Sequence, residues 1–174
     1  MSDNPFVGKW TYRSFLNDPD PAKPFNDLEF GVGAISIEEG PIAALVGVIG
    51  GQGWSLALKG ARSYGDPMRA RFQGVGIVGG ETWIYDYVGY LVPDWPNGVE
   101  QRPAIVGSVV RSLPHSGSNP GTVNPAGVVA SFVAVKAESS ARVPAAVLRG
   151  CRRAFRHHVC SPGASCPVLC TYSL

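Results

Sequence analysis

The sequence predicts an all-β fold, an eight-stranded antiparallel up-and-down barrel with a disordered C-terminal tail. Its 174 residues include 22 glycines and 15 prolines, and only 16% are charged. Turn-forming residues at this frequency, without a collagen-like repeat, are typical of many short strands. Strand-length segments follow one another through hairpin-length links, as in a meander that closes into a barrel. No segment combines a 3.6-residue apolar period with a preceding helix cap.

The predicted barrel domain covers residues 6–136, and residues 137–174 form a separate, basic tail rich in cysteine and arginine. In the first strand, Trp10 and Tyr12 alternate with charged or polar neighbours, so these two rings face the interior. The eight predicted strands are 8–16, 27–39, 42–49, 53–64, 68–78, 81–92, 103–113 and 126–136.

The fourth strand alternates large apolar residues with small or charged ones, beginning at Trp54. The larger set faces inward, which places Arg62 on the same inward row. The turn that follows is short enough to keep this row beside Phe72 on the next strand. The interior is therefore expected to be apolar and aromatic, with a few polar groups.

The stretch GVGIVG at 74–79 matches the G-x-G-x-x-G pattern of dinucleotide-binding loops. That pattern requires a helix directly after it, whereas the residues from Glu81 onward are β-branched and aromatic, so a nucleotide site is excluded. Gly79 and Gly80 instead suit a two-residue hairpin turn, which needs positive φ at its centre. This turn predicts the pairs Val78–Glu81, Gly76–Trp83, Gly74–Tyr85 and Phe72–Tyr87.

The same register assigns the two faces of the sixth strand. Each glycine of the fifth strand lies opposite a large ring on the inner face, which relieves crowding in a small barrel. Asp86 falls on the outer face opposite Gln73 and near Arg71, so it is not favoured as a general base. In the seventh strand, Arg111 lies on the inner face next to Tyr85, below the mouth of the barrel.

Arg111 is a charged residue that is predicted to face the interior without an evident partner. A buried arginine needs an anion or several hydrogen-bond acceptors, because an unpaired charge is costly to desolvate. The inward rows contain no evident carboxylate to supply this. Either Arg111 and the nearby tyrosines hold the carboxylate or carbonyl group of a ligand, or Arg111 extends to the rim and pairs with Asp18 or Asp20.

One rim of the predicted barrel carries two long, proline-rich loops, and long loops in a compact domain are often functional. His115, the single histidine of the body, lies in the second of them, where it can serve acid–base chemistry. A lone loop histidine is more often an ordinary surface residue. Tyr85 and His115 are thus candidates for proton transfer only, and the sequence assigns no catalytic residue. The links at this rim are 17–26, 50–52, 79–80 and 114–125.

Gly8-Lys9-Trp10 on the first of eight strands resembles the G-x-W signature of calycins, the lipocalin and fatty-acid-binding barrels. The similarity extends over VGKWTYRSF and places Trp10 at the closed base of the barrel. The resemblance implies a cup for a small hydrophobic ligand, in which Arg111 with Tyr85 holds a carboxylate. The chain departs from the family in having no helical segment between the first two strands or after the last. Bacterial cyclases of the allene-oxide-cyclase type have a similar outline.

Charge and cysteine content argue against several classes of function. Residues 1–136 hold ten Lys/Arg against twelve Asp/Glu, so this part is not a basic nucleic-acid binder. All four cysteines lie in the tail without C-x-x-C spacing, which argues against a zinc site, and no cofactor is expected. The sequence begins without a signal-peptide pattern, and no apolar run is long enough to span a bilayer, so a cytoplasmic protein is expected.

These patterns favour binding of a small hydrophobic molecule with a polar or anionic head inside the barrel cup. One alternative is a barrel cyclase or isomerase of the allene-oxide-cyclase-like type, acting on a polyketide- or lipid-like substrate, so the sequence leaves open whether the protein is an enzyme. Another is a non-enzymatic assembly module with a filled barrel, which would run as a homo-oligomer. The predicted ligand contacts are Tyr12, Trp54, Phe72, Trp83, Tyr85, Tyr87 and Arg111.

Overall fold

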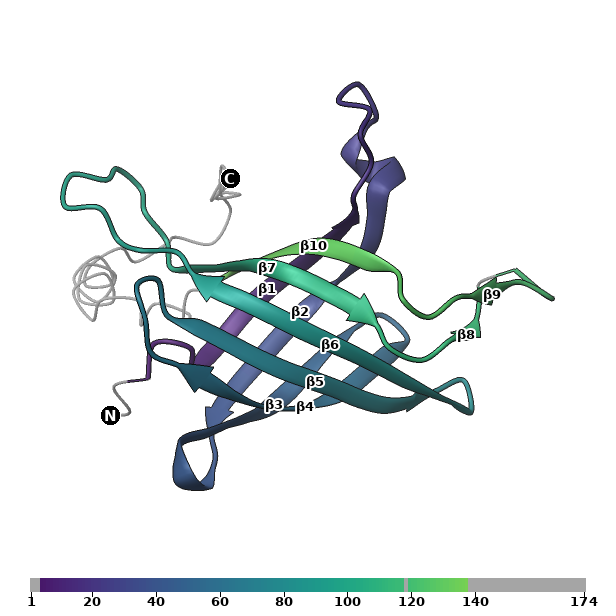
Figure 1. The fold of residues 1–174 in the computed structure, drawn as a ribbon, viewed down its shortest axis with the longest axis horizontal. Coiled ribbons are helices and arrows are strands. Elements are labelled where there is room, and N and C mark those ends of the chain that lie inside the picture. The colour runs from purple at the N-terminus through teal and green to yellow at the C-terminus, as the bar shows by residue number, and fades with distance from the viewer. Residues whose placement is uncertain (1–3, 118, 138–174) are drawn as a thin grey trace, which may run out of the picture. The chain divides into compact units, whose positions relative to one another are not determined.

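The computed structural model describes residues 4–117 and 119–137, and these form a closed antiparallel β-barrel (Figure 1). Each wall strand pairs with its neighbours along the chain, and β1 pairs with β10 to close the barrel. The predicted eight-stranded, all-β barrel is therefore confirmed. The expected disordered tail lies, beyond Ala137, outside the described residues. The wall strands are β1 (Gly8–Leu16), β2 (Glu29–Glu39), β3 (Ala44–Gly51), β4 (Trp54–Ser63), β5 (Arg69–Val78), β6 (Glu81–Leu91), β7 (Ala104–Arg111) and β10 (Val129–Val135).

Two short strands that the sequence did not predict form a separate ribbon, β8 (His115–Ser116) and β9 (Val123–Asn124). This β8–β9 ribbon interrupts the expected 114–125 loop between the last two wall strands. Short 3-10 turns, η1 (Phe25–Leu28) and η2 (Pro41–Ala43), precede β2 and β3, so both strands begin two residues later than predicted. Over the described part of the chain, no helix is long and apolar enough to cross a membrane.

The β5–β6 hairpin has the predicted register. Gly79 and Gly80 adopt φ angles of 60° and 86°, as the two-residue turn requires. Asp86 points outward, where it accepts hydrogen bonds from Gln73 Nε2 at 3.1 Å and from the Ser112 hydroxyl. The residue pairs across the hairpin are those predicted, Val78–Glu81, Gly76–Trp83, Gly74–Tyr85 and Phe72–Tyr87.

The wall includes glycines where neighbouring strands approach too closely for a side chain. At Gly60 an added Cβ would lie 1.9 Å from the carbonyl oxygen of Arg71, and at Gly107 it would lie 1.9 Å from that of Val88. A larger residue at either position would clash with the backbone of the next strand. Glycines at such positions let a small sheet curl until it closes. The interior that results is filled mainly by aromatic and aliphatic side chains.

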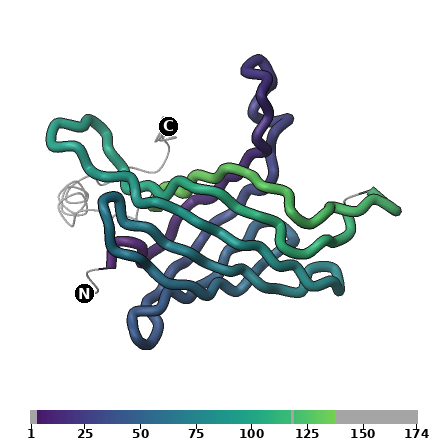
Figure 2. The backbone as a smooth tube through the Cα atoms, in the orientation of Figure 1, coloured from purple at the N-terminus to yellow at the C-terminus, as the bar shows by residue number. Residues whose placement is uncertain are grey.

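One end of the barrel is closed by the N-terminal segment. Trp10 is fully buried, and its Nε1 donates a hydrogen bond to the Phe6 carbonyl oxygen at 2.9 Å. The Lys136 ammonium lies 5.1 Å from the centroid of the Trp10 ring and donates to the Pro5 carbonyl oxygen at 3.4 Å. Figure 2 shows the N-terminal segment at the end of the barrel opposite the β8–β9 ribbon. Trp10 therefore lies at the closed base, and the ribbon lies at the mouth.

Arg62 faces the interior opposite the buried Ala70, as the alternation along β4 predicted. Its guanidinium pairs with a carboxylate oxygen of Glu39 at 3.8 Å and lies 5.2 Å from the centroid of the Tyr64 ring. This cation therefore has an acidic partner within the protein, although its Nε is buried without a hydrogen-bond partner among the described residues.

Candidate functional site

The barrel interior contains a cavity of about 220 Å³ near the mouth. Strands β1, β2, β4, β6 and β7 form its wall, and the β8–β9 ribbon contributes two further residues. An apolar cavity of roughly 150 Å³ is known to hold benzene in a protein core. This cavity is therefore large enough for a single-ring molecule of comparable size with a small polar group attached.

Six of the seven predicted ligand contacts line the cavity: Tyr12, Trp54, Trp83, Tyr85, Tyr87 and Arg111. The seventh, Phe72, is buried in the core and lies outside the lining. The reason is the composition of β5. Its inward positions between Phe72 and the hairpin turn include Gly74 and Gly76, so this strand presents no large side chain to the cavity.

Arg111 lies in the cavity wall with 7% of its surface exposed. Its Nε donates a hydrogen bond to the Tyr85 hydroxyl at 3.2 Å, and Nη1 donates to the Pro125 carbonyl oxygen at 3.1 Å. The guanidinium carbon also lies 4.9 Å from the centroid of the Phe30 ring, which offers a weak cation–π contact. Among the described residues, no carboxylate is within ion-pair distance of Arg111, and Nη2 makes no hydrogen bond.

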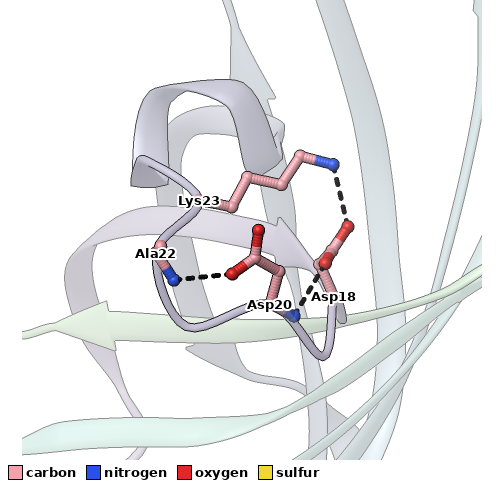
Figure 3. Close-up of polar contacts among 4 residues, drawn as sticks. All are labelled: Asp18, Asp20, Ala22 and Lys23. Carbon is pink, nitrogen blue, oxygen red and sulfur yellow. Dashed lines mark hydrogen bonds and ion pairs between the residues drawn. The ribbon is translucent and has the colours of Figure 1, made fainter.

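The alternative pairing of Arg111 with Asp18 or Asp20 does not occur. Figure 3 shows that both carboxylates are used within their own loop between β1 and β2. Asp18 pairs with the Lys23 ammonium at 2.8 Å, and Asp20 accepts a hydrogen bond from the Ala22 backbone at 2.9 Å. These short-range contacts form locally along the chain, whereas a pair with Arg111 would require this exposed loop to fold over the mouth.

His115 is buried, which contradicts the expectation that a lone loop histidine lies on the surface. Only 6% of its surface is exposed, because the ribbon turns the ring into the cavity. The imidazole stacks on the Trp83 ring, with a centroid distance of 3.9 Å and an angle of 17°. Its Nε2 lies 2.7 Å from the Tyr85 hydroxyl, so the two candidates for proton transfer are in direct contact.

The contacts around Tyr85 determine which atom donates and which accepts in each hydrogen bond. Nδ1 of His115 lies 2.9 Å from the Ser116 carbonyl oxygen, which can only accept, so Nδ1 carries a hydrogen. Nε2 of the neutral ring is then an acceptor, and the Tyr85 hydroxyl donates to it. The Tyr85 oxygen in turn accepts from Arg111 Nε. A continuous chain of hydrogen bonds therefore runs from Arg111 through Tyr85 and His115 to Ser116.

Comparison with family models, with curated proteins and with solved structures finds no match for this chain. The closed, eight-stranded antiparallel barrel agrees in general with the fold that the calycin resemblance implied.

The part of the cavity away from Arg111 is lined by neutral phenols. Burial raises the pKa of Tyr12 from 10.0 to about 12, and it raises the pKa of Tyr87 well above 10.0. The two rings meet edge to face, with centroids 6.2 Å apart. Both hydroxyl groups stay protonated at neutral pH, so they can donate hydrogen bonds but carry no charge.

The β8–β9 ribbon is held to the barrel by Glu81 at the start of β6. The carboxylate of Glu81 accepts hydrogen bonds from the Ser116 backbone at 2.7 Å and from the Ser116 hydroxyl at 2.6 Å. These two bonds lower the pKa of Glu81 below 4.5, with a smaller contribution from the neighbouring His115. Glu81 thus fixes the residue next to His115 and so supports the position of the imidazole.

Several lining residues were not predicted as ligand contacts. Phe30 is the most informative, because strict alternation along β2 would turn it outward. A register shift at Ser14/Phe15 interrupts the β1–β2 pairing and directs Phe30 into the cavity. Asn124 enters from β9, a strand too short to leave a pattern in the sequence. The other lining residues outside the predicted ligand set are Ser14, Gly31, Leu56 and His115.

No cluster of three or more His, Cys, Asp or Glu side chains within residues 4–117 and 119–137 could hold a metal ion. The cysteines considered for zinc lie in the tail, outside the described residues.

Proposed function

We propose that the barrel binds a small molecule that has an apolar body and an anionic or strongly polar head. The main observation that supports this proposal is the state of Arg111. This residue lies in the cavity wall, almost completely buried, with no acidic partner among the described residues and with Nη2 not hydrogen-bonded. A buried cation in this state is stabilised when an anion arrives, and a guanidinium offers parallel donors that suit a carboxylate.

The rest of the lining supports an apolar body of limited size. Trp54, Leu56 and Trp83 offer ring and aliphatic surface, and the neutral hydroxyls of Tyr12 and Tyr87 can donate to a second polar group. A volume of about 220 Å³ suits a single ring or a short chain. The cavity that remains beside the packed core also favours ligand binding over a completely filled barrel that serves only assembly.

A cup of this kind is what the calycin resemblance of Gly8-Lys9-Trp10 implied. The closed base beneath Trp10 and the cavity near the mouth are consistent with a calycin-like binding barrel. The small volume points to a ligand smaller than a long-chain lipid.

The test is binding of single-ring carboxylates to the full-length chain. Native mass spectrometry identifies any molecule that is retained and then released on denaturation, and titration calorimetry measures the affinity for benzoate. We expect benzoate to bind the wild type and to bind Arg111→Gln at least tenfold more weakly, since a charged hydrogen bond contributes about 1.5–3 kcal/mol. Arg71→Gln, which removes an exposed arginine from the outer face, is the matched control and should bind normally.

Equal affinity of the wild type and Arg111→Gln for benzoate would contradict the proposed head-group site. A chain that releases no molecule and binds no single-ring anion would contradict the proposed function as a whole.

A further inference from the structure

We propose that the same cavity is also catalytic: Tyr85, coupled to His115, removes a proton from a carbon next to a ketone in a small keto acid held by Arg111. The inference rests on the proposed ligand site and names its substrate class. Because Arg111 Nε is hydrogen-bonded to the Tyr85 oxygen, a carboxylate at Nη2 lies close to that oxygen. The carboxylate and the acidic carbon of the substrate must therefore be separated by few bonds.

The hydrogen bonds around Tyr85 leave its oxygen ready to accept a proton from the cavity. One lone pair is occupied by Arg111 Nε, and the hydroxyl hydrogen points to Nε2 of His115 at 2.7 Å. The second lone pair has no partner among the described residues. Since Tyr85 lines the cavity, this lone pair is available to a ligand.

The proton transfer conserves charge at each step. The substrate C–H proton moves to the Tyr85 oxygen, while the Tyr85 hydroxyl proton moves to Nε2 of His115. The electron pair of the broken C–H bond stays on the substrate as an enolate, and Tyr85 remains neutral throughout. Return of a proton from His115 through Tyr85, to the same carbon or to another atom of the enolate, completes exchange or isomerisation.

Several neighbours of His115 can contact the imidazolium that forms. Nδ1–H already donates to the Ser116 carbonyl oxygen at 2.9 Å, and the ring lies flat against Trp83, where a cation gains from the aromatic face. The negatively charged Glu81 carboxylate also lies near, since it accepts two hydrogen bonds from Ser116, the residue that follows His115. The Arg111 guanidinium is a positive charge nearby and disfavours a second cation at His115. The substrate carboxylate and the enolate together balance the charges of Arg111 and His115.

The neutral phenols of Tyr12 and Tyr87 complete the arrangement. They line the same cavity and are both electrostatic neighbours of Tyr85. As protonated donors they can bind the ketone oxygen, where the negative charge of an enolate develops. Donors fixed in a site that excludes water stabilise such charge more than solvent does.

Deuterium exchange in the full-length protein tests this chemistry directly. The probe is 3-oxocyclohexane-1-carboxylate, a single ring with a carboxylate and an enolisable ketone, followed in D₂O by proton NMR. We expect the protein to accelerate exchange at C2, which lies between the ketone and the carboxylate-bearing carbon, in preference to C4. Tyr85→Phe and His115→Gln should each slow the exchange by about 100-fold or more. Asp86→Asn, on the outward face of β6, should exchange at the wild-type rate.

Binding of the probe is measured in parallel by calorimetry, so that the two proposals fail separately. Binding without exchange above the buffer rate overturns the catalytic inference and leaves the ligand site intact. Absence of both binding and exchange overturns both. If Tyr85→Phe does not fold, His115→Gln decides the matter: wild-type exchange by this variant overturns the inference, and its loss with binding retained supports it.

Discussion

Two buried tyrosines, Tyr12 and Tyr87, supply the cavity with hydroxyl groups that are polar but uncharged. Each phenol keeps its proton because burial disfavours the anion, so the pKa of Tyr12 rises to about 12 and that of Tyr87 rises well above 10.0. The cavity therefore offers uncharged donors beside the one guanidinium. This combination suits the proposed ligand, which has one anionic head and a second group that accepts hydrogen bonds.

The same shift predicts a loss of stability in alkaline solution. A pKa that is higher in the folded state than in the unfolded chain stabilises the fold below pH 10, and this stabilisation is lost as the pH rises from 10 toward 12. We expect the urea midpoint of the wild type to fall over this range. In Tyr12→Phe the fall should be shallower, and tyrosinate absorbance should lose a component that titrates about two pH units above free tyrosine. Identical titration curves for the two proteins would contradict the assignment.

At the residue scale, side-chain alternation predicted most of the cavity and failed where the backbone departs from a regular strand. Tyr85 and Arg111 were placed correctly because the Gly79-Gly80 turn fixes the register of β6, and β7 follows from it. Phe30 was missed because the register shift in the β1–β2 pairing reverses its direction. Burial of His115 depends on long-range contacts with Trp83 and Tyr85, which leave no local pattern in the sequence.

Among the elements, the β8–β9 ribbon is the least regular and the most closely connected to the site. It has two residues in each strand and is not part of the barrel wall. Sequence periodicity cannot detect strands of this length, so the segment was predicted as a loop, whereas the long wall strands were predicted to within a few residues. The ribbon is positioned by the two hydrogen bonds from Ser116 to Glu81.

This attachment predicts that the ribbon detaches in acid. The pKa of Glu81 is lower in the folded state than its usual value of 4.5. The stabilisation that the Glu81–Ser116 hydrogen bonds give to the ribbon is therefore present above pH 4.5 and is lost as the pH falls further. Glu81→Gln should weaken the attachment at neutral pH as well, because the amide is a poorer acceptor than the carboxylate. We expect a shifted Ser116 amide resonance and altered Trp83 fluorescence in this variant at pH 7.

Glu38→Gln, which neutralises an exposed carboxylate on β2, is the matched control for Glu81→Gln. Both signals should be unchanged in the control. If Glu81→Gln also leaves the Ser116 resonance and the Trp83 fluorescence unchanged, Glu81 does not hold the ribbon.

At the scale of the whole molecule, the barrel is closed at one end and narrow inside, and this limits what it can admit. Trp10 and the N-terminal segment close the base, and core side chains such as Phe72 fill the space above it. About 220 Å³ remains near the mouth. The strand count predicted a cup, but it could not predict how much of the interior the side chains would fill.

The limited volume predicts selection by size among carboxylates. Benzoate and hexanoate fit a space of this order, whereas the chain of decanoate would have to displace core side chains or leave most of its length in water. We expect decanoate to bind at least tenfold more weakly than benzoate in calorimetric titrations. Tighter binding of decanoate would show that the interior expands to hold lipid chains.

The position of His115 and Asn124 on the β8–β9 ribbon makes the cavity dependent on a segment outside the barrel wall. The ribbon at the mouth carries two side chains of the cavity wall, so a barrel whose ribbon is detached has an incomplete cavity. Tyr85 in such a barrel would also lack its hydrogen-bond partner His115. A substitution that weakens the attachment of the ribbon is therefore expected to weaken the proposed ligand site even where the substituted residue lies outside the cavity lining.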